Sequence, residues 1–586
     1  MSTESNTNGP RSLKEASQAL ILYAKDQWRM LGFSLLFFII GAAFEPMVPA
    51  LFKKLLDSGF QEGLKYPIWL VPVIIIGLFL CRGMANFAGA YTMSSATSGI
   101  VLSLRRDLMR GLLKADAKLF TTISPGIAVT KVINDPQFAA QALGGSAISL
   151  IKDATTLVFL MAYLFYLNWQ LTLLSMVTLP LLAVTVKLVQ KRLAKVGEAQ
   201  YQAQQNLVST VDDNARAWKV VRTFDAADFE LKRFDEQALR HRRLTLKQVA
   251  ASSLVTPATQ VVAAIGISII LTLALYQASK GTQTVGEFVS FLTALLMTVS
   301  PLRHLTDVYQ PINNALITLR GALEIMNTPP EPDLGTQVMP TSKGDIRFNK
   351  VWLEYEGAPA PALKGFDVHI QPGQTIALVG SSGAGKTTVV NTLLRFANPT
   401  QGQITLDGVP IDDLKLASLR RHFAVVSQDI VLFEGSVAQN VAYASPGGLD
   451  RAKVEQCLRA ANLWAHVSAQ PEGMDMSIGT NGTRLSGGQR QRLAIARALY
   501  RDAAVWIFDE ATSALDSESE AIVQKSIESL RGSKTLILIA HRLSTIKNAD
   551  CIYVMSDGQV LEQGDHAALM AKGGAYAGMV RLQSAD

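Results

Sequence analysis

One uncharged stretch limits the fold more than any other feature of this sequence. Residues 249–277 contain no aspartate, glutamate, lysine or arginine. About 20 mainly apolar residues are enough for a helix to cross the hydrocarbon core of a membrane, so this stretch is predicted to be a membrane-spanning helix. Other mainly apolar stretches predict five further spans, at residues 30–52, 68–91, 144–167, 170–188 and 288–302.

The composition supports this division of the chain. Apolar residues make up 49% of the 586 residues and charged residues only 18%, with a mean hydropathy of +0.21. The uncharged stretches crowd the first half, and the second half has the composition of a soluble α/β domain. Within the spans, Glu45 and Pro46 interrupt the first one, and Asn168-Trp169 predict a tight hairpin between the third and fourth. Cys81, Cys457 and Cys551 are too far apart in sequence to indicate a zinc site or a disulfide framework.

The basic residues predict the orientation in the membrane. The segments 93–143 and 189–248 carry six and twelve lysines and arginines, whereas the opposite loops carry only Lys53, Lys54, Lys65 and Lys280. Because cytoplasmic loops are enriched in basic residues, both long segments and both termini are predicted to be cytoplasmic. Their helical periodicity predicts that spans two to five continue well beyond the bilayer. Basic residues beside spans also explain the net charge of +7 more simply than binding of nucleic acid would.

A glycine-rich segment in the second half carries the clearest chemistry. An apolar stretch of strand length, 376–379, leads into a G-x-x-x-x-G-K-T sequence, and an apolar-periodic stretch follows. This strand, loop and helix order is that of a phosphate-binding P-loop, whose backbone N–H groups surround phosphate oxygens. Lys386 is expected to reach the terminal phosphates and Thr387 to bind Mg²⁺. The predicted ATP-binding residues here are Gly380, Ser381, Ser382, Gly383, Ala384, Gly385, Lys386, Thr387 and Thr388.

Two further motifs point to a family. The sequence L-S-G-G-Q at 485–489, and the apolar strand 505–508 followed by Asp509 and Glu510, resemble the nucleotide-binding domain of ATP-binding-cassette (ABC) proteins. The prolines at 329, 330 and 332 indicate a linker. The predicted organisation is a cytoplasmic tail and amphipathic segment (1–27), a transmembrane domain (28–325), a linker (326–345) and an ABC domain (346–586).

The resemblance assigns roles to single residues. It implies that Tyr355 stacks on adenine, and that Gln428 contacts Mg²⁺ and the attacking water. Asp509 would hold Mg²⁺, Glu510 would act as general base, and His541 would bind the γ-phosphate. The signature residues Ser486, Gly487, Gly488 and Gln489 would bind ATP held by a second ABC domain. Since this chain has one P-loop and one signature, it is expected to pair, most simply as a homodimer, although a heterodimer would complete the same sites.

One position departs from the family pattern. Exporters of this type usually carry an acidic residue two positions before the glycine that precedes the signature, and Thr480 stands there. This puts in doubt an interface salt bridge to the partner's cytoplasmic helices and leaves the catalytic residues untouched.

The membrane half is similar to bacterial lipid A exporters. The stretches 104–108, 168–171, 220–224 and 300–303 are family-like. Arg82, Lys152 and Arg303 fall at similar depths, about 22, 24 and 30 Å from the external ends at 1.5 Å per residue. They match basic positions of that family that face phosphorylated glucosamine, while Ser300 replaces another. Charges inside a membrane usually face a cavity or a partner, and local pairing, for example of Lys152 with Asp153, is the alternative.

The sequence therefore predicts an ATP hydrolase coupled to lipid export. The expected fold is a six-span helical bundle fused to an α/β ABC domain, located in a bacterial inner membrane with its ATPase domain in the cytoplasm. The expected activity is the flipping of an anionic lipid, lipid A or lipid A-core, to the outer leaflet, with ATP and Mg²⁺ as cofactors. The alternatives are a multidrug or other lipid exporter with the same ATPase, and a regulatory membrane protein that senses nucleotide. The spans exclude a soluble ABC ATPase.

Overall fold

The computed structural model divides the chain into two compact units, Met1–Glu331 and Pro332–Asp586. It describes residues 13–61, 67, 69–176, 178–279, 284–355, 357–445, 447–509, 517–539 and 546–584. The division lies within the segment 326–345 that the sequence predicts as a linker. Each unit is described by itself below.

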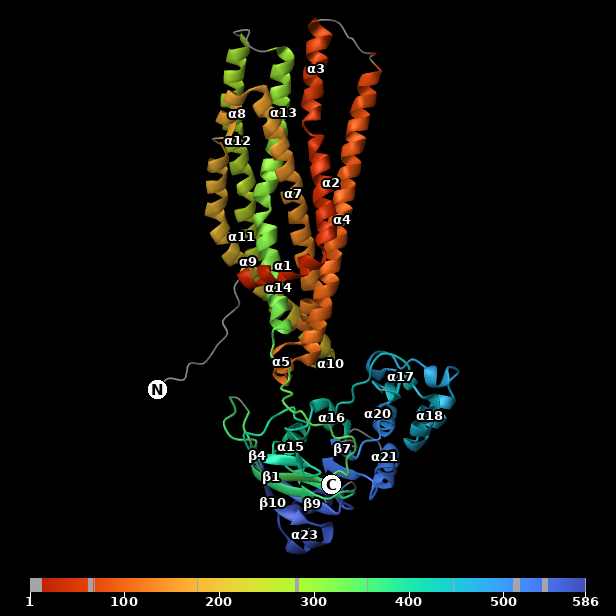
Figure 1. Ribbon diagram of the computed structural model, residues 1–586. Coiled ribbons are helices and arrows are strands. Elements are labelled where there is room, and N and C mark those ends of the chain that lie inside the picture. The colour runs from red at the N-terminus through yellow and green to blue at the C-terminus, as the bar shows by residue number, and fades with distance from the viewer. Residues whose placement is uncertain are drawn as a thin grey trace. The chain divides into compact units, whose positions relative to one another are not determined.

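The first unit is helical throughout its described residues (Figure 1). Its N-terminal helix α1 covers Leu13–Asp26, and two short helices, α5 (Ala117–Thr122) and α10 (Trp218–Thr223), join longer ones. The long elements are α2 (Trp28–Ala43), α3 (Met47–Gln61), α4 (Leu70–Lys114), α7 (Asp135–Leu167), α8 (Trp169–Met176), α9 (Thr178–Arg216), α11 (Ala227–Ser253), α12 (Val255–Ser279), α13 (Val285–Asp307) and α14 (Tyr309–Met326).

Four helical stretches of the described residues are long and apolar enough to cross a membrane: Trp28–Asp57, Leu70–Lys114, Pro125–Leu167 and Val285–Met326. They contain the first, second, third and sixth predicted spans. Helices α8, α9 and α12 cover the fourth and fifth, and many of their side chains lie outside the described set. Helix α4 is continuous over 45 residues, about 68 Å at 1.5 Å per residue. It is therefore more than twice as long as the hydrocarbon core is thick.

The predicted breaks in the spans are confirmed. Helix α2 ends at Ala43 and α3 begins at Met47, as expected because Pro46 lacks the N–H that would continue the helix. Helix α7 ends at Leu167, and the side chain of Asn168 accepts a hydrogen bond from the N–H of Leu171 at 3.1 Å. Asn168 thus caps the next helix and makes the hairpin.

Close contacts between small and polar residues hold the spans together. Ser34 of α2 donates to the carbonyl of Gly89 on α4 at 2.8 Å. On the other side of the bundle, the fully buried Ser290 of α13 donates to the carbonyl of Pro49 on α3 at 2.7 Å. The hydroxyl of Tyr163, on α7, lies 2.8 Å from Ser290 Oγ. Three spans therefore meet at one buried hydroxyl, a typical arrangement for helices in a membrane.

One expected connection is placed differently. The resemblance to ABC exporters implies coupling helices, short elements that transmit movement to the ATPase domain, near residues 125–134 and 213–224. Residues 125–134 instead form α6 (Pro125–Val129) and a π-helical turn (Thr130–Asn134) that lead directly into α7. The separate short helix is α5, and the linker chain pairs beside it, because Asp116 N–H donates to the Pro329 carbonyl at 3.2 Å. The second expected coupling segment, 213–224, contains α10.

The second unit combines two sheets. A six-stranded sheet has the order β10-β9-β3-β8-β7-β6, in which all neighbours are parallel except β10 with β9. A four-stranded antiparallel sheet has the order β2-β1-β4-β5. The strands are β1 (Ile346–Leu353), β2 (Leu363–Ile370), β3 (Thr375–Gly380), β4 (Gln401–Leu406), β5 (Val409–Pro410), β6 (Phe423–Val426), β7 (Val505–Asp509), β8 (Thr535–Ile539), β9 (Cys551–Ser556) and β10 (Gln559–Gly564).

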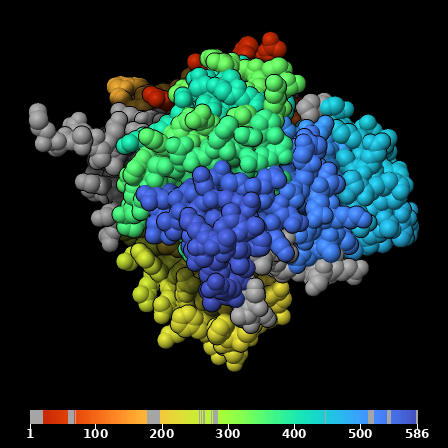
Figure 2. Space-filling view, turned by 90° about the horizontal axis from the view of Figure 1, so that it is seen from below, coloured from red at the N-terminus to blue at the C-terminus, as the bar shows by residue number. Residues whose placement is uncertain are grey.

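The helices of this unit fall into two groups. A helical lobe lies at one end, blue to cyan in Figure 2, where α17 (Val437–Val441), α18 (Arg451–Ala460) and α19 (Trp464–Ser468) gather near α20 (Gly487–Arg501). The remaining helices accompany the sheets: α15 (Lys386–Leu393), α16 (Leu416–Arg421), α21 (Ser517–Leu530), α23 (His566–Lys572) and α24 (Ala575–Ser584). In the lobe, burial raises the pKa of the Cys457 thiol, as expected for a structural rather than a reactive cysteine.

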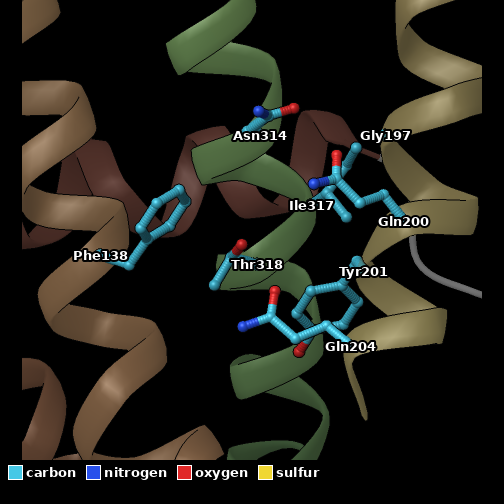
Figure 3. Close-up of a pocket in the computed structure, with 8 residues that line it drawn as sticks. All are labelled: Phe138, Gly197, Gln200, Tyr201, Gln204, Asn314, Ile317 and Thr318. Carbon is cyan, nitrogen blue, oxygen red and sulfur yellow. The ribbon is translucent and has the colours of Figure 1, made fainter. Parts of the chain in front are cut away.

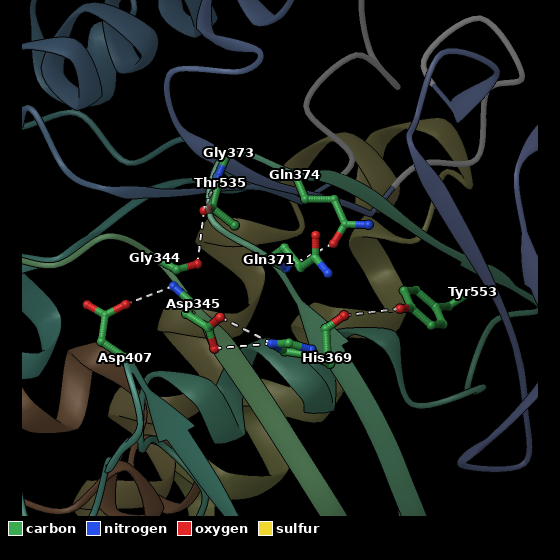
Figure 4. A network of polar contacts seen from close by, with 9 residues as sticks. All are labelled: Gly344, Asp345, His369, Gln371, Gly373, Gln374, Asp407, Thr535 and Tyr553. Carbon is green, nitrogen blue, oxygen red and sulfur yellow. Dashed lines mark hydrogen bonds and ion pairs between the residues drawn. The ribbon is translucent and has the colours of Figure 1, made fainter.

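The two sheets share one apolar core and one polar seam. Phe348 of β1 and Phe366 of β2 meet edge to face at 5.1 Å and pack with Leu378 of the larger sheet. In the seam, Thr535 Oγ1 accepts from the N–H of Gly373 at 3.0 Å and donates to the carbonyl of Gly344 at 2.9 Å (Figure 4). Thr535 is fully buried, so both backbone groups depend on its hydroxyl.

This seam gives a stability prediction. We expect Thr535→Val to lower the free energy of unfolding of the ATPase unit by about 1–3 kcal/mol, because one buried and one part-buried backbone group would lose their partner. The measurement is thermal unfolding of the full-length protein in detergent. Thr535→Ser is the control and should stay close to wild type, since it keeps the hydroxyl. A valine variant as stable as wild type would show that the seam contributes nothing.

Candidate functional site

The P-loop lies between β3 and α15. The strand ends at Gly380 and the helix begins at Lys386. Gly385, directly before the helix, has a φ of +99°, and a Cβ there would lie 2.8 Å from the carbonyl oxygen of Ala362. Only glycine fits this position without strain. The loop thus brings its backbone N–H groups and the N-terminus of α15 to one place, where a phosphate is stabilised by both.

The side chains of the loop are arranged for a charged ligand. Ser381, Ser382, Gly383 and Thr387 are exposed. Lys386 is buried, and its Nζ donates to the carbonyls of Gly380 at 2.8 Å and Ser381 at 2.9 Å. Its ammonium group therefore lies against the loop that would hold the phosphates.

The strand register brings further predicted residues to the same edge of the sheet. Asp509 is the last residue of β7 and pairs with Ile539 of β8, which in turn pairs with Leu378 of β3. Gln428 is exposed and follows β6, the other neighbour of β7. The carboxyl ends of parallel strands form the ligand edge of such a sheet. A carboxylate and an amide oxygen thus lie at the same edge of the sheet as the phosphate loop, and oxygen ligands are those that Mg²⁺ prefers.

The signature sequence starts the longest helix of the lobe. Ser486 is the N-cap of α20, where its Oγ accepts from the N–H of Gln489 at 3.2 Å and Gln489 Oε1 accepts from the N–H of Ser486 at 2.8 Å. This reciprocal pair is a capping box. It fixes the first turn, in which Gly487 is exposed with nothing near the position of a Cβ. The helix N-terminus is therefore open to an anion.

Four further residues of this unit were singled out from the sequence: Tyr355, Glu510, His541 and Thr480. Tyr355 is two residues beyond β1 and 41% exposed, so its ring is accessible to a base. Glu510 and His541 lie outside the described residues, and their roles stay predictions. Thr480 is exposed.

Next to Thr480, sequence reasoning missed Asn481. Its Oδ1 accepts from the N–H of Leu432 at 3.1 Å, which ties the loop before the signature to the segment after Gln428. Asn481 has a φ of +50°, a conformation that asparagine tolerates better than most residues. An asparagine directly before Gly482 was the available signal.

The predicted substrate cations have acidic neighbours in the membrane unit. Arg82 of α4 forms an ion pair with Glu45, at the break between α2 and α3. Lys152 of α7 lies within electrostatic reach of Glu45 and Asp153. Sequence reasoning noted Glu45 only as an interruption of the first span and did not find its partner.

The third predicted substrate cation also has an acidic neighbour. Arg303 of α13 lies within electrostatic reach of Asp307. Beside it in sequence, His304 Nδ1 lies 3.2 Å from Asp153 Oδ2, a contact between α13 and α7 that sequence reasoning also missed. Charged groups of both signs are thus gathered on these spans.

A separate cavity lies farther along the bundle. It is a partly open pocket between α7, α9 and α14, has a volume of about 70 Å³, and is lined by amide and hydroxyl groups as well as Phe138 and Ile317 (Figure 3). A water molecule needs about 10–15 Å³ by this measure, so the cavity holds a few waters and is too small for a lipid. It is not the substrate site.

Similarity to known proteins identifies the family of this chain. The family model described as ABC transporter transmembrane region matches residues 31–302, and the model described as ABC transporter matches residues 363–513. The ATP-dependent lipid A-core flippase of Cupriavidus metallidurans is 42% identical over 567 residues, covering 96% of this chain and 95% of the relative. That of Ralstonia nicotianae is 40% identical over 587 residues, covering 100% and 99%.

This chain belongs to the ATP-dependent lipid A-core flippase family of ABC exporters. A solved bacterial Atm1-family ABC exporter with ATP bound matches its fold with a TM-score of 0.82 and 26% identity, over 95% of this chain and 98% of that one. The predicted fold class is confirmed. The chain is a multi-pass membrane protein with one transporter membrane region and one ATP-hydrolysing ABC domain, and is therefore a half-transporter.

The P-loop geometry predicts the behaviour of a lysine variant. We expect Lys386→Ala to weaken ATP binding about tenfold or more, because a charge-assisted contact to phosphate contributes about 1.5–3 kcal/mol. Titration with fluorescent ATP measures the affinity. Lys343→Ala, at an exposed lysine of the same unit, is the control and should bind as wild type does. Unchanged affinity of the Lys386 variant would count against the assigned role.

Proposed function

We propose that this chain flips lipid A or lipid A-core from the inner to the outer leaflet of the bacterial inner membrane, driven by ATP hydrolysis. The observation that carries the proposal is similarity over the whole chain, membrane half included, to proteins named ATP-dependent lipid A-core flippases. A multidrug exporter would share the ABC domain, and this similarity along the membrane spans favours the lipid.

The working unit of this proposal is a homodimer. The P-loop follows β3 and the signature begins α20 in the helical lobe, and each is present once in the sequence. In the expected assembly, the P-loop of one copy and Ser486, Gly487, Gly488 and Gln489 of the other enclose one ATP. Two identical chains complete two such sites with closed symmetry.

Mg²⁺ fits the residues at the ligand edge of the sheet. The exposed hydroxyl of Thr387, the carboxylate of Asp509 and the amide oxygen of Gln428 are all oxygen donors. Mg²⁺ would supply neutralisation of the phosphate charge. Glu510 then positions and deprotonates the attacking water, His541 contacts the γ-phosphate, and Tyr355 stacks on adenine.

Closure of the two ABC domains around ATP is coupled to the membrane unit through short helices. We assign this role to α5 and α10, which join the long cytoplasmic ends of the spans. Differential binding of ATP to the closed form shifts the equilibrium toward a cavity open to the outside, and hydrolysis returns it. Both termini and the ABC domain lie in the cytoplasm in this arrangement.

The assignment of Glu510 gives a kinetic prediction. We expect Glu510→Gln to retain ATP binding and to accumulate a closed dimer, while turnover falls about 10²-fold or more, as for the loss of a general base. Steady-state hydrolysis and ATP affinity are measured on the same preparation. Hydrolysis at a near wild-type rate would mean that another residue activates the water.

The assignment of the membrane cations gives a prediction on the substrate. We expect Arg82→Ala and Arg303→Ala each to raise the lipid A concentration for half-maximal ATPase stimulation about tenfold, because each loses a charge-assisted contact to phosphate. The assay uses nanodiscs with increasing lipid A. Lys54→Ala, at an exposed residue near the external end of the first span, should change little.

Equal stimulation of all three variants would remove these cations from the substrate site. The exporter of drugs or other lipids would then be the better description of this chain.

A further inference from the structure

The ion pair between Arg82 and Glu45 is placed by the packing of two spans. Helices α2 and α4 run side by side, and Gly41 of α2 lies against Asn86 of α4, where a Cβ on the glycine would come within 3.0 Å of the amide oxygen. Glu45 follows one helical turn after Gly41, and Arg82 precedes Asn86 by one turn. The Glu45 carboxylate and the Arg82 guanidinium therefore meet one step farther along the same interface between α2 and α4.

The two partners of this pair differ in accessibility. The side chain of Glu45 is 8% exposed, whereas that of Arg82 is 26% exposed. An anion can therefore reach the guanidinium while the carboxylate stays covered. A guanidinium carries five N–H donors, so it can turn toward a new anion without leaving its place on α4.

A lipid anion that binds Arg82 must compete with Glu45 for the guanidinium, and the groups around this ion pair bear on that competition. Glu45 also lies within electrostatic reach of Lys152, the second predicted substrate cation. Glu45 therefore pairs directly with one predicted substrate cation, Arg82, and lies near a second. A buried carboxylate in a membrane span is costly unless it is paired, so a functional reason for its presence is expected.

We propose that Glu45 is a resident counter-ion of Arg82 that the headgroup of a lipid must displace, and that Glu45 thereby sets the charge a lipid needs to enter. This inference rests on the proposed function. A phosphate monoester carries about −1.5 to −2 charges at pH 7 with three acceptor oxygens, and so it outcompetes one carboxylate. A phosphodiester headgroup with a single charge offers no more than the carboxylate it would replace. Glu45 is thus a specificity-determining residue that works by rejecting weakly charged lipids.

The test compares two lipids in the full-length protein. ATPase stimulation is measured in nanodiscs with increasing lipid A or with increasing phosphatidylglycerol, which has one negative charge. For Glu45→Gln, we expect the half-maximal concentration of phosphatidylglycerol, divided by that of lipid A, to fall about tenfold. The ratio falls chiefly because phosphatidylglycerol becomes effective. One charge-assisted contact corresponds to about that factor. Glu287→Gln is the matched control. It removes an acid that pairs with Lys53 at 3.0 Å, away from Arg82, and should keep the wild-type ratio.

A double variant distinguishes the failure of this inference from that of the proposed function. Adding Glu45→Gln to Arg82→Ala should leave the lipid ratio as in Arg82→Ala alone, because the ion pair between Glu45 and Arg82 is then already absent. This comparison also holds if Glu45→Gln alone fails to fold, since the double variant removes both charges. An unchanged ratio in Glu45→Gln, or a further narrowing in the double variant, would overturn the role of Glu45. If Arg82→Ala itself leaves lipid A stimulation unchanged, the substrate contact of the proposed function fails instead.

Discussion

A charge within a membrane needs a partner of opposite sign or access to water, and this constraint organises the membrane unit. Glu45 sits at the break between α2 and α3 and pairs with Arg82 of α4. Asp153 of α7 contacts His304 of α13. The pairs join helices that are adjacent in the bundle, so the positions of the charges and the packing of the spans depend on each other. In the proposed function these cations bind the anionic lipid, and in the further inference Glu45 pairs with Arg82 until the lipid displaces it.

The ATPase unit follows a different constraint, which is the shared edge of a parallel sheet. The P-loop follows β3, Asp509 ends β7 and Gln428 follows β6. Their order along the chain is unrelated to their order in the sheet, and the sheet brings them together. The signature residues begin a helix of the lobe, and in the proposed homodimer they bind the nucleotide held by the P-loop of the second copy. The geometry of one chain therefore supports pairing as a condition for hydrolysis.

Much of the fold and of the ATP site could be predicted from short stretches of sequence. The P-loop and the signature are short sequences that contain their own geometry, since Gly385 needs its backbone conformation and Ser486 with Gln489 forms its cap within four residues. Pro46 and Asn168 likewise break the helices at the positions expected from their backbone chemistry. The continuation of residues 125–134 into α7 has a local cause as well. Proline is well tolerated in the first turn of a helix, and α6 begins at Pro125.

Contacts between distant residues were beyond the reach of the sequence. Arg82 and Glu45 are on different helices, and nothing in either local sequence names the other. Pairing of Lys152 with the adjacent Asp153 was the natural local alternative, yet Asp153 also contacts His304, 151 residues away. The role of Asn481 depends on a hydrogen bond from the backbone N–H of Leu432, which is distant in the sequence. Glu510 and His541 rest on the family resemblance, outside the described residues.

Movement of the lipid itself tests the central claim most directly. The purified chain would be reconstituted alone into vesicles that contain labelled lipid A, and a membrane-impermeant reagent would report the fraction of label in the outer leaflet over time. The account predicts that ATP with Mg²⁺ shifts this fraction within minutes, whereas vesicles without ATP keep their initial distribution. ATP hydrolysis at the full rate, with lipid A distributed as in the ATP-free vesicles, would contradict it.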